Sequence, residues 1–101
     1  MKLIQTLSEE IEEELDGAEN YVKMALSHKS EHPNLAKTLY DISLDEMRHV
    51  DLLHSEVVKL IEEHRRTKGE PPASMMAVYD YLHKRHIEKA NEIRMYQNQY
   101  K

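Results

Sequence analysis

Residues 35 to 64 carry a stripe of side chains at intervals of three or four residues, the spacing of one face of an α-helix. The stripe consists of Leu35, Leu39, Ile42, Glu46, His49, Leu53, Val57, Leu60 and His64. No glycine or proline interrupts the run. The pattern therefore predicts one helix over about 34–67, roughly 50 Å long at 1.5 Å per residue. A chain of 101 residues with so long a helix must pack most of its remaining length along it.

Two further helices are predicted on either side of this one. The first, over about 7–29, begins with a capping-box pattern at Thr6 and Glu9, and its apolar stripe is Ile11, Leu15, Ala18 or Glu19, Val22 and Leu26. Pro33 suits the start of the next helix, so residues 7–67 should form an antiparallel hairpin. Gly69 and Pro71-Pro72 mark a linker over 68–72, followed by a third helix over about 73–99. No stretch resembles a strand, so the expected fold is all-α, with residues 1–101 as a single domain.

Composition excludes several classes of function. The chain has no cysteine, which rules out disulfides, zinc–thiolate sites and iron–sulfur clusters. A net charge of −5 argues against nucleic acid as the main partner. No apolar run approaches the ~20 residues that a membrane span needs, and no signal peptide is visible, so a cytoplasmic protein is expected.

Glu46 and His49 interrupt the apolar stripe of the long helix with an ionisable pair. A carboxylate among apolar side chains is costly unless it is paired or binds a metal. Glu19 occupies a similar position on the first helix, and in an antiparallel hairpin the heights of Glu19 and Glu46 differ by about one turn. One chain would thus supply two carboxylates and one imidazole. Two chains related by a two-fold axis would supply four carboxylates and two imidazoles, which is the ligand set of a di-iron or di-manganese bundle.

Two neighbouring residues would support such a site. Asp45 lies four residues before His49 and could accept a hydrogen bond from its imidazole. Arg48 could balance the charge of Asp45 or of nearby acids. The simpler alternative is that Glu46 and His49 are a buried polar pair that fixes the register of packed helices.

The segment Asp45-Glu46-Met47-Arg48-His49 resembles the D-E-x-R-H motif of the ferritin-like superfamily, and residues 18–25 resemble the first-helix segment of its rubrerythrin-like members. The layout is similar to encapsulated ferritins, in which one hairpin dimerises. This resemblance implies that Glu19 binds or bridges metal, that Glu46 bridges it and that His49 is a terminal ligand. Rubrerythrin-like members usually have a tyrosine seven residues after the first glutamate, whereas position 26 here is Leu26.

The expected function is therefore a di-iron carboxylate protein with ferroxidase-type activity, which oxidises Fe(II) with O₂ or peroxide for sequestration or detoxification. Mn or Zn are alternative metals, and whether the chain is an enzyme is left open. A hairpin plus one helix leaves apolar stripes uncovered, so a homodimer forming a four-helix bundle is expected. The alternative function is a non-enzymatic adaptor or assembly module. His83 and His86 on the third helix are interpreted as interfacial residues, with a role as extra metal ligands as the less favoured alternative.

Overall fold

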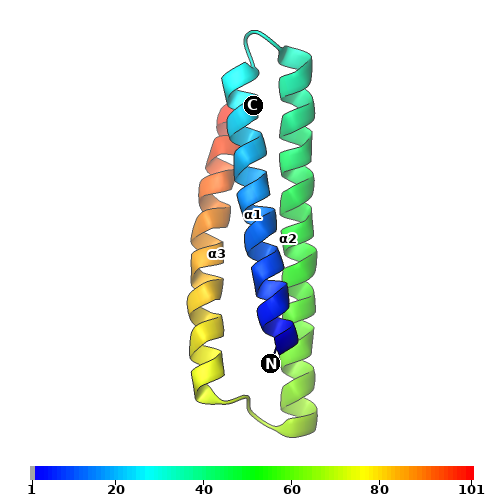
Figure 1. Ribbon diagram of the computed structural model, residues 1–101, viewed down its shortest axis with the longest axis vertical. Helices are drawn as coiled ribbons and strands as arrows, with labels where there is room; N and C mark the ends of the chain where they lie inside the picture. The colour runs from blue at the N-terminus through cyan, green and yellow to red at the C-terminus, as the bar shows by residue number, and fades with distance from the viewer. Residues whose placement is uncertain (1) are drawn as a thin grey trace.

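A computed structural model describes residues 2–101 and confirms the all-helical class. Helix α1 spans Lys2–His28, α2 spans Pro33–Lys68 and α3 spans Ala73–Tyr100, with no strand among the described residues. The three helices lie along one long axis, and the molecule measures 56 × 18 × 18 Å (Figure 1). Over residues 2–101, no helix is both long and apolar enough to cross a membrane.

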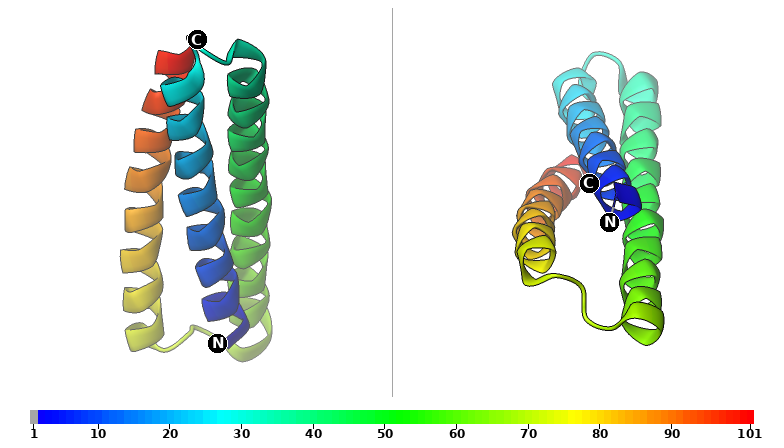
Figure 2. Two further views of the ribbon diagram at one scale, coloured as in Figure 1. Left: turned by 45° about the horizontal axis from the view of Figure 1, so that its top comes forward. Right: turned by 60° about the horizontal axis from the view of Figure 1, so that its bottom comes forward.

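The hairpin of α1 and α2 is the main packed unit, and α3 lies beside α1 and runs parallel to it (Figures 1 and 2). The core of the hairpin includes Leu15, Val22 and Val57, which are at most 1% exposed. Helix α3 is attached less firmly, since its buried residues are only Ala90, Ile93 and Gln97. All three lie in the C-terminal half of α3, so its N-terminal half has little support from the core.

The predicted helix boundaries need small corrections. Helix α1 begins by Lys2 rather than near residue 7, and Thr6 is not its N-cap, since its hydroxyl donates to the carbonyl of Lys2 inside the helix. Helix α2 extends one residue further at each end than predicted, and α3 extends to Tyr100. The capping-box spacing was misleading because residues before it continue the same apolar pattern, with Ile4 buried.

The predicted stripe of α2 is displaced around the helix from the side that forms the core. Its core side is Ala36, Leu39, Tyr40, Ser43, Met47, Val50, Val57 and Ile61. Leu35 from the predicted stripe is 49% exposed, and Ile42, Leu53 and Leu60 are only partly buried. Helix α2 therefore has two adjoining apolar sides. Its own chain buries one of them and covers the other only in part, where Leu53 and Leu60 pack against the core.

The uncovered side of the hairpin forms what we call the open face. It combines residues that share a side of α1 or α2 by helical spacing and are not buried in the core. Helix α3 does not cover it, because α3 pairs with Glu12 and Glu19 on another side of α1. The open face consists of Leu3, Leu7, Glu14, Gly17, Tyr21 and Met24 on α1 and Leu35, Ile42, Glu46, His49, Leu53 and Leu60 on α2.

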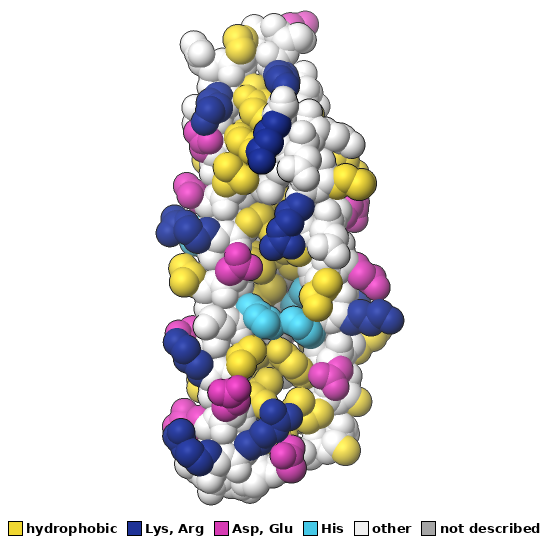
Figure 3. Space-filling view, turned by 180° about the vertical axis from the view of Figure 1, so that it is seen from behind, with side chains coloured by type: hydrophobic (Ala, Val, Ile, Leu, Met, Phe, Trp, Pro, Cys, Tyr) yellow, Lys and Arg dark blue, Asp and Glu magenta, His cyan; other side chains and the backbone are white. Residues whose placement is uncertain are grey.

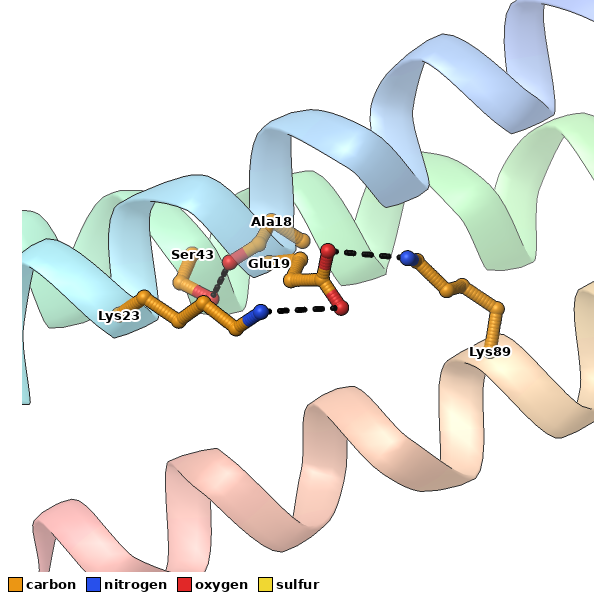
Figure 4. Close-up of polar contacts among 5 residues, drawn as sticks. All are labelled: Ala18, Glu19, Lys23, Ser43 and Lys89. Atoms are coloured by element: carbon orange, nitrogen blue, oxygen red, sulfur yellow. Dashed lines mark hydrogen bonds and ion pairs between the residues drawn. The ribbon is translucent and has the colours of Figure 1, made fainter.

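A buried hydrogen-bond chain ties the three helices together in the half of the molecule that holds the α1–α2 turn and the C-terminus. The Ser43 hydroxyl donates to the Ala18 carbonyl at 2.7 Å and accepts from the Gln97 amide nitrogen at 3.0 Å. Figure 4 shows the contact between Ser43 and Ala18. Because the contacts satisfy polar atoms inside the core, they favour one register of the helices over others.

Candidate metal centre

Glu14, Glu46 and His49 meet at the centre of the open face. One ligand atom from each lies within 4.8 Å of the other two, and all three residues are partly buried. His49 Nδ1 lies 3.4 Å from Glu14 Oε2. In residues 2–101 this is the one group of three or more carboxylate, imidazole or thiol residues with such close ligand atoms. Two carboxylate oxygens and one imidazole nitrogen are donors that suit Fe(II), Mn(II) and related divalent cations.

Gly17 lies against this cluster. A Cβ atom placed on Gly17 would lie 3.5 Å from Glu46 Oε2, so the Glu46 carboxylate rests directly against the backbone of α1. Gly17 follows Glu14 by three residues and therefore lies on the same side of α1. The carboxylate of Glu46 on α2 therefore lies close to that of Glu14 on α1.

The two carboxylates are electrostatically coupled. Hydrogen bonding with Glu14, followed by burial and the negative charge of Glu14, raises the pKa of Glu46 to about 7. The neighbouring His49 lowers the pKa of Glu46 and so partly offsets these effects. Near neutral pH the pair can therefore share a proton, because two adjacent carboxylates resist ionising together. A bound divalent cation would replace that proton and remove the repulsion.

The structure places Glu19 away from this cluster. Lys89 Nζ of α3 lies 2.9 Å from Glu19 Oε1, and Lys23 Nζ lies 3.8 Å from Glu19 Oε2 (Figure 4). Five residues separate Glu14 from Glu19, which turns the side chains about 140° apart around the helix. The structure thus brings Glu46 and His49 together with Glu14, and it joins Glu19 to α3.

Asp45 and Arg48 lie at the edge of the cluster. Arg48 Nη2 lies 3.5 Å from Asp45 Oδ1, and their side chains are 65% and 63% exposed, respectively. The charge of Asp45 contributes to the raised pKa of Glu46. The contact to His49 that was expected from Asp45 is made by Glu14 instead.

The sequence indicates that Glu14, Gly17 and Tyr21 share one side of α1, because they follow each other at intervals of three and four residues. It does not indicate that this side meets Glu46 and His49.

The fold and the cluster define an all-helical protein with a candidate carboxylate–imidazole cation site. No protein-family model, curated protein or solved structure matches the chain.

The raised pKa of Glu46 predicts a pH-dependent stability. A group whose folded-state pKa lies above its ordinary 4.5 favours folding at low pH, and this contribution is lost as the pH rises towards about 7. Glu46→Gln should therefore match the metal-free parent near pH 5 and be more stable near pH 8. Urea unfolding of both proteins at the two pH values measures this. If the difference in stability between Glu46→Gln and the parent is the same at both pH values, the two carboxylates do not share a proton.

The two glycines of the chain should respond to alanine in opposite ways. At Gly17 a Cβ makes an ordinary 3.5 Å contact, so Gly17→Ala should raise the free energy of unfolding by about 1 kcal/mol through helix propensity. Gly69 has φ +83°, which side chains rarely adopt, so Gly69→Ala should lower it by about 1–3 kcal/mol. Urea unfolding measures both, and a loss of stability in Gly17→Ala would show that Glu46 has no freedom to shift.

Proposed function

We propose that this chain is a ferritin-like iron protein that binds Fe(II) through Glu14, Glu46 and His49 and promotes its oxidation by O₂ or peroxide. The observation that carries the proposal is the convergence of these three side chains in the middle of an otherwise apolar face. The resemblance of residues 45–49 to the D-E-x-R-H motif supports the choice of iron over other cations. Mn(II) and Zn(II) suit the same donors.

Each residue of the cluster has a distinct part in this proposal. Glu46 loses its proton when the cation arrives, which fits its raised pKa. Glu14 supplies the second carboxylate and lies 3.4 Å from His49 Nδ1, so a cation bound by both side chains would replace this contact. Negative carboxylates also stabilise Fe(III) more than Fe(II), so they favour the transfer of one electron from each iron to the oxidant.

A second copy of the chain would complete the site. Three donors from one chain are few for tight iron binding, and the open face around them is apolar. Leu3, Met24 and Leu35 on this face are 39–52% exposed. Pairing two open faces about a two-fold axis would bury these side chains and bring together four carboxylates and two imidazoles. We propose this dimer, a four-helix bundle of two hairpins, as the active form.

The alternative function is a helical assembly module. It is favoured by α3, which exposes Val78, Tyr81 and Met95 at 60%, 63% and 56%. Such side chains suit contact with another protein. In this alternative, Glu46→Ala and His49→Ala would dimerise and melt like the parent, and neither would lose any Fe(II) oxidation.

Anaerobic addition of Fe(II) to the purified protein tests the proposal. We expect about one tightly bound iron ion per chain, two per dimer, followed by rapid oxidation when O₂ is admitted. Metal analysis after gel filtration measures the stoichiometry, and absorbance measures the oxidation. Failure to retain Fe, Mn or Zn under these conditions would contradict the proposal.

A further inference from the structure

A second candidate site lies in a groove between α2 and α3. The groove holds a cleft of about 330 Å³, with Ile11, Val50 and Ile87 among its apolar lining. Figure 3 shows histidine side chains in the middle of an otherwise apolar strip on this side of the molecule. The histidines that line the cleft are His54 from α2 and His83 and His86 from α3. Three imidazoles from two helices thus face one small space.

The three imidazoles are closely arranged. The rings of His54 and His83 stack with centroids 4.6 Å apart and planes 14° apart. The ring of Tyr79 also stacks with that of His83, and their centroids are 5.7 Å apart. His86 follows His83 by three residues and therefore lies on the same side of α3.

Two of the ring nitrogens have no partner. His54 Nε2 and His86 Nε2 are both inaccessible to solvent and make no hydrogen bond. Buried polar atoms are nearly always satisfied, so two such atoms in one groove require an explanation. A cation bound by these nitrogens would provide one.

The surroundings keep these histidines available as ligands. Burial lowers the pKa of His54 and His86 below the usual 6.5, which favours the neutral form of imidazole that binds metal. The negative charge of Asp51 on α2 raises the pKa of His54, and that of Glu12 on α1 raises the pKa of His86, each partly offsetting the effect of burial. Carboxylates beside ligand histidines commonly accept a hydrogen bond from the second ring nitrogen and so orient the ring.

We propose that His54, His83 and His86 form a second metal site, separate from the carboxylate cluster and selective for a nitrogen-preferring divalent cation of the Zn²⁺ class. Three imidazoles are a ligand set found for Zn²⁺, which keeps a fourth position for water. The ring nitrogens do not all lie within 4.8 Å of one another in this structure. Metal binding therefore requires the stack of His54 on His83 to open and coordination to replace it.

The consequence of binding is the attachment of α3. No residue of α3 before Ala90 is fully buried, so its N-terminal half has few contacts with the core. A cation held by His54 of α2 and by His83 and His86 of α3 would fasten that half to the hairpin. The site does not depend on the proposed iron chemistry.

Zn²⁺ titration with a chromophoric chelator as competitor tests the proposal. The experiment uses full-length protein carrying Glu14→Gln and Glu46→Gln, which removes the contribution of the carboxylate cluster. We expect one Zn²⁺ per chain, and His83→Ala or His86→Ala should weaken binding at least about tenfold, since each removes one of three ligands. Amide hydrogen exchange over residues 73–89 should slow on Zn²⁺ addition in the background protein and not in these variants.

Two controls make the result specific. His28 and His32 have ring centroids 6.1 Å apart at the other end of α2, and replacing both with alanine should leave the affinity unchanged. His83→Asn keeps a polar side chain in the groove and should lose binding as His83→Ala does. Zn²⁺ binding that survives replacement of His83 and His86, or that is lost with His28 and His32, would overturn the proposal. Zn²⁺ binding in this background together with an absence of iron oxidation in the parent protein would instead count against the proposed function alone.

Discussion

Replacing Glu14 with glutamine should abolish tight Fe(II) binding, whereas the same change at Glu19 should leave it intact. Glu14 lies within the cluster with Glu46 and His49, and Glu19 is paired with Lys89 on another side of α1. Loss of one carboxylate from so small a donor set should lower iron affinity on the order of 100-fold, the upper end of what loss of an outer-shell partner causes. Oxidation should then fall to the rate of free iron in buffer.

The pair Glu14→Gln and Glu19→Gln is closely matched, since both remove one negative charge from the same helix. Glu46→Ala and His49→Ala should behave like Glu14→Gln. Absorbance of the oxidised iron and metal analysis measure the effect, and circular dichroism checks that helicity is retained. Loss of iron binding in Glu19→Gln, with Glu14→Gln unaffected, would mean that Glu19 is the ligand and that its contact with Lys89 breaks in the dimer.

Adding charge to the open face should split the dimer and remove oxidation together. Met24 and Leu35 are 39% and 49% exposed in the single chain, so Met24→Lys with Leu35→Lys should not disturb its fold. In the dimer the same positions would be buried, and unpaired lysines there are costly. We expect at least tenfold weaker dimerisation, measured by sedimentation, with iron oxidation reduced in proportion.

A matched pair of lysines elsewhere serves as the control. Leu44 and Leu52 are 40% and 58% exposed and lie outside the open face, so Leu44→Lys with Leu52→Lys should leave both dimer and oxidation unchanged. If the two double variants behave alike, the open face is not the dimer interface. If Met24→Lys with Leu35→Lys becomes monomeric but still oxidises iron at the parental rate, the site does not need a second chain.

Helical spacing was sufficient to predict the three helices and their antiparallel hairpin, because the chain has long uninterrupted apolar periods bounded by proline and glycine. The meeting of Glu46 with His49 also followed from spacing, since residues three apart share a side of a helix. The same rule could not choose between Ala18 and Glu19 as the inward residue of α1. The structure buries Ala18 completely and turns Glu19 towards α3.

The choice of Glu14 needed three-dimensional information for a physical reason. Position along a hairpin gives the height of a residue, but its direction around the helix depends on which side meets the partner helix. Helix α2 has apolar residues on two adjoining sides, and periodicity alone does not say which one packs inside the chain. Contacts such as Ser43 with Ala18 fix that choice, and they leave Glu46 and His49 on the open face beside Glu14.

The most direct measurement is an anomalous difference map at the iron edge from crystals of Fe(II)-loaded protein. We expect two peaks per dimer, each close to Glu14, Glu46 and His49, with both chains contributing ligands about a two-fold axis. A peak beside Glu19, or no peak near Glu46 and His49 in iron-loaded crystals, would contradict it.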